Sequence, residues 1–226
     1  MMNRLFYSIL ICVVAISASA QSRAIYVNPA FYSLAKDHKK VAVIPFDVQI
    51  GLRPKERAAM TDEQLQDMQH KEGVAAQNAL VSWFLKKQNT QGYSVQFQDV
   101  NTTNALLLKA GMNIHDLTSH TPDEIAKTLG VDAIMGGLIQ TTKPISDGAS
   151  VAMGVLLGYY GSTNTGNITI NLNDSAAGAL LWKYDKALSR SLGSNMNQIM
   201  DTLMRKASKQ FPYGDMETLR DEERKS

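Results

Sequence analysis

The residues that could support catalysis or nucleotide binding are few and widely spaced in this 226-residue chain. Gly161 and Gly166 have the glycine spacing of a phosphate-binding P-loop, but Asn167 and Ile168 stand where that motif needs lysine and a hydroxyl side chain. Without them there is no positive charge for the phosphates and no magnesium ligand. We therefore expect a flexible polar loop here and no nucleotide site.

Histidine is the next candidate for chemistry, and the sequence holds only His38, His70, His115 and His120. None belongs to an H-E-x-x-H motif or a close carboxylate–histidine cluster, and the five-residue spacing of His115 and His120 does not put both on one helix face. We expect surface or helix-capping histidines and no metal site.

The sequence also lacks a motif typical of hydrolases. There is no G-x-S-x-G turn for a serine nucleophile, and the carboxylates Asp62, Glu63 and Asp67 stand at a helix start, where the helix dipole alone accounts for them. A glycosidase pair is positioned by the fold and not by local spacing. We expect no catalytic residues and no cofactor, while a deep pocket holding two carboxylates with raised pKa values would favour an enzyme.

A short basic group precedes the first apolar segment. Lys36, His38, Lys39 and Lys40 could contact an anionic surface, but Asp37 interrupts them, and a solvated approach to a strand is the simpler interpretation. The formal net charge of +2 likewise argues against broad nucleic-acid binding.

The apolar stretch "SVAMGVLLGYYG" leaves two interpretations open. It is about half the length of a membrane-spanning helix and lacks the alternating polarity of a pore-forming strand. It is either a core strand or short helix, or an exposed patch in residues 149–161 for an oligomer or partner. The candidate interface residues are Val151, Met153, Val155, Leu156, Leu157, Tyr159 and Tyr160.

The first twenty residues have the pattern of a secretory signal peptide. Arg4 is followed by an apolar run and then by Ala18-Ser19-Ala20, an A-x-A cleavage site. The only cysteine, Cys12, lies in this run without the small preceding residues of a lipoprotein signal, so we expect neither a lipid anchor nor disulfides. The expected location is the periplasm or the exterior, with at most peripheral contact with the outer membrane.

Strand and helix patterns alternate along the chain and predict an α/β (α+β) fold. Residues 41–46 are nearly all apolar, as in a strand buried on both faces, and residues 61–88 have helical periodicity with a capping box from Thr61 to Gln64. Gly73 interrupts this helix and marks either close packing or a bend. A half-buried strand over residues 93–100 follows.

The second half of the chain predicts two further helices and the rest of the sheet. Residues 101–110 and 121–130 are helical, the latter with Thr121 as its cap, and residues 131–142 return to a strand. Two strands joined by a turn then form an antiparallel hairpin at the sheet edge, with Trp182 and Tyr184 facing the core. An amphipathic helix closes the fold with Met196, Ile199, Met200, Leu203, Ala207 and Phe211 on one face.

These patterns predict one domain, a mixed sheet flanked by helices. The expected division is a signal peptide at 1–20, a lead segment at 21–40, the α/β domain at 41–213 and a charged tail at 214–226, either a frayed helix or disordered.

Three segments together resemble a known group of envelope domains. They are "KKVAVIPF", "TPDEIAKTLGVDAIMGGLIQ" and "NDSAAGALLW", and the resemblance covers roughly residues 39–211. The group comprises CsgG-type curli-secretion lipoproteins, the lipoprotein activators of penicillin-binding proteins and the amino-terminal domain of the Tol system's propeller protein. The resemblance implies a domain that binds other envelope proteins and has no catalytic residues.

We therefore expect an exported interaction or assembly module of the cell envelope that binds other envelope proteins or itself. Two alternatives stay open: a periplasmic enzyme or binding protein acting on envelope glycan or a small molecule, and a component of an oligomeric secretion channel.

Overall fold

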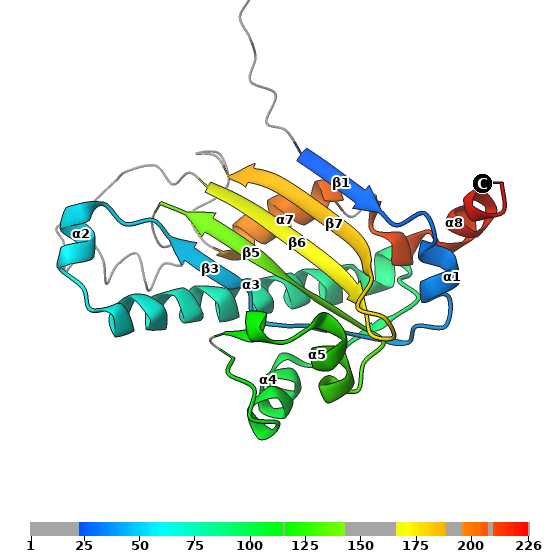
Figure 1. Ribbon diagram of the computed structural model, residues 1–226. Coiled ribbons are helices and arrows are strands. Elements are labelled where there is room, and N and C mark those ends of the chain that lie inside the picture. Colours follow the sequence, from blue (N-terminus) through cyan, green and yellow to red (C-terminus); the bar gives the residue numbers. More distant parts are fainter. Residues whose placement is uncertain (1–22, 115, 143–165, 189–195, 208–209, 226) are drawn as a thin grey trace, which may run out of the picture.

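A mixed β-sheet runs through the protein with helices packed on both of its faces (Figure 1). The computed structural model describes residues 23–114, 116–142, 166–188, 196–207 and 210–225. Within these residues the sheet has seven strands, which are β1 (Arg23–Val27), β2 (Lys40–Val43), β3 (Asp47–Ile50), β4 (Gln96–Phe97), β5 (Ala133–Thr141), β6 (Gly166–Asp174) and β7 (Leu180–Leu188).

Helices connect and cover these strands. They are α1 (Phe31–Ala35), α2 (Pro54–Ala58), α3 (Asp62–Gln91), α4 (Val100–Lys109), α5 (Pro122–Leu129), α7 (Met196–Ala207) and α8 (Met216–Glu223), with short 3₁₀ turns η1 (Leu117–Ser119) and η3 (Pro212–Gly214). The predicted fold class, α/β with a mixed sheet, is confirmed.

Strand β5 is the centre of the sheet. The strand order is β1-β7-β6-β5-β2-β4, with β3 also paired to β5. Strands β2 and β3 run parallel to β5 and occupy successive halves of the same edge, because the chain between them contains Pro45. On the other edge β6 is antiparallel to β5, and β7 continues the hairpin.

The sheet extends further than the sequence predicts. Strand β1 pairs antiparallel with β7, so the hairpin is not at the edge. The outer position of β1 is stabilised by Ile25 and Val27, which pack against the main core. At the opposite edge, β4 pairs over only two residues, shorter than the predicted strand at 93–100, because Ser94 hydrogen-bonds to Tyr213 instead of continuing along β2.

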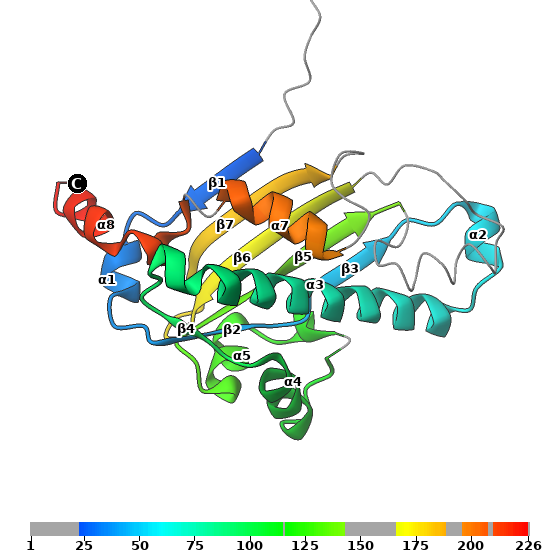
Figure 2. The same ribbon diagram turned by 180° about the vertical axis from the view of Figure 1, so that it is seen from behind.

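The main core lies between one face of the sheet and helices α3 and α7 (Figure 2). The predicted inward face of the closing helix is confirmed for Ile199, Met200, Leu203 and Ala207, all of which are buried. Phe211 is buried too, but it lies beyond the end of α7, which is shorter than the predicted helix. Trp182 and Tyr184 also face this core, as predicted.

A smaller second core lies on the other face of the sheet, where α4 and α5 pack against β2 and β5 (Figure 1). Ile134 of β5 meets Leu107, Ile125 and Leu129 there. These two helices cover only the β2 end of this face, and Figure 1 shows β6 and β7 without a helix in front of them.

Capping residues set the helix ends as predicted. Thr61 accepts a hydrogen bond from the Gln64 amide and the Gln64 side chain returns one to Thr61, and Thr121 and Glu124 do the same at α5. The tail contains helix α8, in which Leu219 packs against the core. None of the helices in the described ranges is long and apolar enough to cross a membrane.

Candidate functional site

The sequence-predicted interface residues from Val151 to Tyr160 lie outside the described residues, as do the signal-peptide segment, His115 and most of the P-loop-like stretch. His70 and His120 line cavities, whereas His38 is buried. Among the described residues, no three His, Cys, Asp or Glu side chains come together as a metal site would require.

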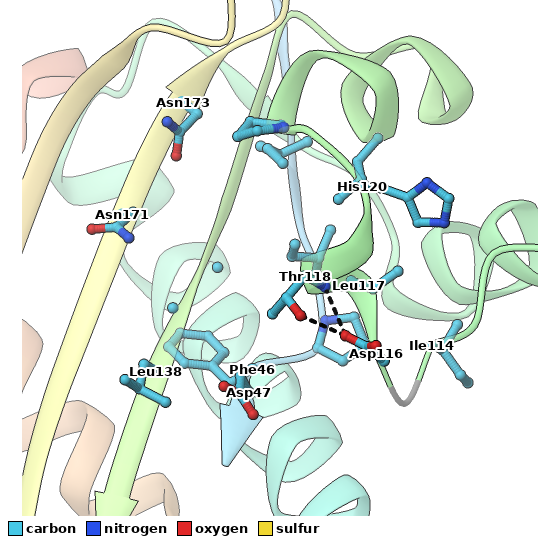
Figure 3. A pocket seen from close by; sticks show the side chains of 17 residues that line it. Phe46, Asp47, Ile114, Asp116, Leu117, Thr118, His120, Leu138, Asn171 and Asn173 are labelled. Atoms are coloured by element: carbon cyan, nitrogen blue, oxygen red, sulfur yellow. Dashed lines mark hydrogen bonds between the residues drawn. The ribbon is translucent and has the colours of Figure 1, made fainter. Parts of the chain in front are cut away.

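A cavity of about 340 Å³ opens on the sheet face that carries the second core, between β5 and β6 on one side and η1 and α5 on the other (Figure 3). Figure 3 shows Asn171 and Asn173 of β6 opposite Leu117 and Thr118. The cavity is lined by Ile44, Pro45, Phe46, Asp47, Ile114, Asp116, Leu117, Thr118, His120, Pro122, Ile125, Ile134, Gly136, Gly137, Leu138, Asn171 and Asn173.

Strand alternation builds the β6 wall of this cavity. Ile168, Ile170 and Leu172 point into the main core, so the residues between them point to the opposite face. Asn171 and Asn173 therefore reach the cavity as two neutral amide side chains from one strand.

The bottom of the cavity is apolar, and a glycine of β5 leaves room there for a neighbouring side chain. Gly136 is the cross-strand partner of Asn171, and a Cβ atom at Gly136 would lie only 2.7 Å from Cγ1 of Ile44. Glycine thus allows Ile44 to pack down onto the sheet, beside Ile134.

Some of the polar side chains that line the cavity form hydrogen bonds with other described residues, and one polar atom does not. Asp116 Oδ1 accepts hydrogen bonds from the Thr118 amide at 3.2 Å and the Thr118 hydroxyl at 2.5 Å, which hold η1 in place. Asn173 Nδ2 donates to the Gly178 carbonyl at 3.2 Å. By contrast, Oδ1 of Asn171 is buried and has no hydrogen-bond partner among the described residues.

A second cavity, of about 310 Å³, continues from the first. The two share Phe46, Asp47, Ile114 and Asp116, so these residues form their junction. The second cavity is further lined by Val48 of β3, Gln66, Gln69 and His70 of α3, and Asn113. We call the two connected cavities the groove.

The groove is acidic. Among the described residues, neither lining contains lysine or arginine. The carboxylates at the junction, Asp47 and Asp116, form no ion pair within this part of the chain. Both are exposed, unlike the desolvated carboxyl group that serves as a general acid in glycosidases. The arrangement can therefore bind donors of hydrogen bonds.

A second polar cluster joins three distant parts of the chain. His38 Nδ1 lies 2.6 Å from the Tyr213 hydroxyl, and His38 Nε2 lies 3.1 Å from Oδ1 of Asp174. Because a carboxylate only accepts, Nε2 donates to Asp174, and in the neutral imidazole Nδ1 then accepts from the tyrosine hydroxyl. Oδ2 of Asp174 accepts from the amides of Ala176 and Ala177.

The three side chains are linked by hydrogen bonds in the order found in proton relays, but they are buried and out of reach of a substrate. His38, Asp174 and Tyr213 are 8%, 3% and 1% exposed, and none of them lines the groove. Burial, followed by the negative charges of Asp174 and Asp132, raises the pKa of Tyr213 far above its usual range, so the hydroxyl remains a donor. The cluster is a structural link between the start of β2, the β6–β7 turn and the C-terminal segment.

In the predicted solvated basic group, Lys36, Lys39 and Lys40 are exposed, as predicted. The prediction is wrong for His38, which is buried because both nitrogens of its imidazole have hydrogen-bond partners inside the protein.

The sequence patterns also did not predict the residues of the groove. Asp47, Asp116 and Asn171 come from separate segments, and only the polar alternation in "NITINLND" signals that one face of β6 stays outside the core.

No family model matches this sequence. No curated protein matches it either. Among solved structures, the chain is similar to Escherichia coli LpoB, with 9% identity over 84% of this chain and 81% of that chain and a TM-score of 0.41. It is also similar to lipoprotein GNA1162 from Neisseria meningitidis, with 17% identity over 76% of this chain and 94% of that chain and a TM-score of 0.40.

A third similar structure is the PelC dodecamer from Paraburkholderia phytofirmans, with 14% identity over 82% of this chain and 94% of that chain and a TM-score of 0.38. LpoB represents the activator lipoproteins that the sequence resembles, whereas resemblance to the curli-secretion and Tol proteins stays a prediction. At these identities and TM-scores, we draw no conclusion about function from the three structures.

Proposed function

We propose that this chain is an exported, non-catalytic interaction module of the cell envelope whose groove binds an extended segment of a partner protein. The observation that carries the proposal is the groove itself. Two connected cavities, of about 340 and 310 Å³, run beside an open part of the sheet and combine an apolar floor with neutral amide and carboxylate walls.

The shape of the groove favours a chain-like ligand. Its two parts meet at Asp47 and Asp116 and lie on different elements, one over β5 and β6 and the other between β3 and α3. A compact metabolite would fill one cavity, whereas a polypeptide segment can place successive side chains in both. Apolar surface then supplies affinity and the polar walls fix orientation.

The experiment that tests this function is affinity purification of the tagged protein from its own cell envelope in mild detergent. The groove variant is Asn171→Trp, which fills the first cavity opposite Gly136. The matched control is Asn167→Trp, an exposed position on the same face of β6 that does not line the groove.

We expect a stoichiometric envelope partner with the unchanged protein and the control, and its loss with Asn171→Trp. Circular dichroism and the melting temperature of each variant verify that the fold is retained. Equal recovery of the partner with both variants would contradict binding in the groove, and a partner-free protein would contradict the interaction function as a whole.

A second contact surface rests on the sequence alone. We propose that residues 149–161, with Val151, Met153, Val155, Leu156, Leu157, Tyr159 and Tyr160, also contact a partner or a second copy. Charged replacements at Leu156 and Leu157 are expected to break the assembly while leaving the fold intact. Loss of folding instead would assign these residues to the core.

A further inference from the structure

The outer edge of strand β1 is a second surface that the protein leaves open. β1 is the outermost strand of the sheet, beyond β7, and among the described residues it pairs with no other strand (Figure 1). Tyr26 is 43% exposed, and Ala24 is exposed as well. The edge is therefore accessible to another strand.

The backbone of β1 directs alternate residues toward β7 and away from it. Asn28, which directly follows β1, donates its amide N–H to the Leu181 carbonyl at 2.8 Å. Since hydrogen-bonded and non-bonded pairs alternate along antiparallel strands, Ala24 and Tyr26 also direct their backbone groups toward β7. The residues whose N–H and C=O groups point outward are Arg23, Ile25 and Val27.

The β1 edge lacks the features that usually prevent strands from pairing between molecules. Proteins protect such edges with proline, charged side chains, bulges or very short strands. The opposite side of this sheet has two of these features, because β4 spans two residues and Pro45 lies between β2 and β3. Residues 24–27 contain no charge and no proline, and their pairing with β7 has no register shift. Isoleucine, tyrosine and valine also favour strands.

We propose that β1 pairs antiparallel with β1 of a second copy of this chain, around a two-fold axis at Ile25. In this register Ile25 lies opposite Ile25 of the second copy, and Arg23 lies opposite Val27 in both directions. These are the three residues whose backbone groups point outward. Both copies therefore bring hydrogen-bonding groups to matching positions.

The two edges of the sheet favour a two-fold pair over a ring or filament. A head-to-tail assembly would need β1 to pair with the opposite edge of the next copy. That edge offers only two residues in β4, and next to β3 the Phe46 amide already donates to the Gly73 carbonyl of α3. A two-fold pair uses the same five-residue strand twice, so the lengths match.

The exposed side chains of β1 are compatible with this register. Tyr26 of each copy lies opposite Ala24 of the other, so a large side chain meets a small one. The cross-strand neighbours of these residues in β7 are Lys183 and Asp185. They form an ion pair with each other at 3.1 Å, so pairing brings no net charge of one sign together.

The pairing of β1 would also set the direction of the two grooves. Directly opposite side chains of an antiparallel pair point to the same face, so the open faces of both copies face the same way. The dimer then presents two grooves on one side of a continuous sheet. Its formation does not depend on what the groove binds.

Sedimentation velocity of the tagged protein, purified from its own cell envelope, measures the pairing. One strand pair buries less area than a standard protein interface, so we expect a weak dimer with a dissociation constant of about 1 to 100 µM. Samples from about 1 to about 300 µM should therefore change from monomer to dimer.

Two substitutions at Ile25 separate its backbone from its side chain. Ile25→Pro removes an outward N–H, which an edge strand tolerates, and should weaken the dimer at least about thirtyfold because two symmetric hydrogen bonds are lost. Ile25→Ala is the matched control, since it also loses the packing of Ile25 against the core but keeps the amide. It should weaken the dimer less than about fivefold. Circular dichroism and the melting temperature verify that both variants fold.

Cysteine crosslinking tests the register. The only cysteine of the chain, Cys12, lies in the predicted signal peptide. A mixture of Ala24→Cys and Tyr26→Cys proteins places the two thiols directly opposite each other, within reach of a disulfide. Under mild oxidation we expect the mixture to form crosslinked dimers faster than either variant alone.

The outcomes decide between a second copy and another occupant of the edge. A monomer at every concentration would overturn the pairing, and so would a dimer that both Ile25 variants weaken equally. A monomer whose Ile25→Pro variant also loses an envelope partner would assign the edge to a strand of that partner instead. Asn171→Trp should leave the dimer intact, so failure of the groove and failure of the β1 pairing are separate results.

Discussion

At the scale of single residues, the cluster of His38, Asp174 and Tyr213 shows how polar groups stabilise this protein's interior. Each hydrogen-bonding atom of the imidazole has one partner, and the second oxygen of Asp174 is held by two backbone amides. Removing any member leaves a buried atom without its partner, which is costlier than losing an exposed contact.

Tyr213→Phe is therefore expected to lower the free energy of unfolding by about 1 to 3 kcal/mol at neutral pH, because Nδ1 of His38 loses its donor. Burial raises the pKa of Tyr213 above the unfolded value of about 10, so its contribution is present below that pH and lost above it. The difference between the two proteins should shrink as pH rises past about 10.

Urea unfolding at about pH 7 and about pH 11 measures this difference. Tyr26→Phe is the control, since the same change at a tyrosine that is 43% exposed should have little effect. A stability gap for Tyr213→Phe that stays constant over this pH range would refute the assignment.

Asn171→Leu is expected to keep or raise stability. The change removes a buried oxygen that has no partner among the described residues and adds a residue better suited to a strand. Asn173→Leu is the comparison, and it should lower the free energy of unfolding by about 1 kcal/mol because the Gly178 carbonyl loses its donor. A larger loss at Asn171 than at Asn173 would contradict the description of the cavity wall.

At the scale of elements, the long helix α3 is positioned by a close approach to the sheet. A Cβ atom at Gly73 would lie 2.2 Å from the Phe46 carbonyl oxygen, and the Phe46 amide donates to the Gly73 carbonyl. The close packing that the sequence offered as one role for Gly73 is confirmed, and it holds Phe46 at the junction of the groove.

Gly73→Ala should consequently destabilise the protein by about 2 kcal/mol or more, although alanine is the better helix former by about 1 kcal/mol. Asn78→Ala, at an exposed position on the same helix, should cost less than about 0.5 kcal/mol. Thermal unfolding of both variants provides the comparison. Stabilisation by Gly73→Ala would show that α3 does not depend on this contact.

Two parts of the C-terminal segment contribute unequally to the stability of the fold. Phe211 and Tyr213 are buried in the main core, whereas α8 contributes the partly buried Met216 and Leu219 and has no buried residue. A chain that ends after Asp215 should fold with a modest loss of stability. A chain that ends after Gln210 loses two core aromatic residues, each worth about 3 to 5 kcal/mol, and should not fold stably.

Limited proteolysis and circular dichroism of the two truncated chains test this division. Cooperative folding of the shorter chain would contradict it, as would unfolding of the longer one.

At the scale of the whole molecule, local signals explain what the sequence could predict. The caps at Thr61 and Thr121 and the inward face of α7 depend on neighbouring residues, and the structure confirms them. The pairing of β1 with β7 and the burial of His38 join residues more than a hundred positions apart. No local pattern specifies such contacts.

The groove was unpredictable for the same reason. Asp47 follows β2, Asp116 precedes α5 and Asn171 lies in β6, so only the folded sheet brings them to one face. The sequence does signal that the outward residues of β6 are polar, yet that pattern equally describes an ordinary solvated strand.

The most direct test of the central claim is site-specific photo-crosslinking in the intact cell envelope. The photo-crosslinker p-benzoylphenylalanine replaces exposed Thr118, which lines the groove, or exposed Asp201, on the opposite face of the sheet. A groove that binds a partner segment predicts one dominant crosslinked protein from position 118 and none from position 201. A partner crosslinked equally from both positions, or from position 201 alone, would contradict the assignment of the groove as the binding site.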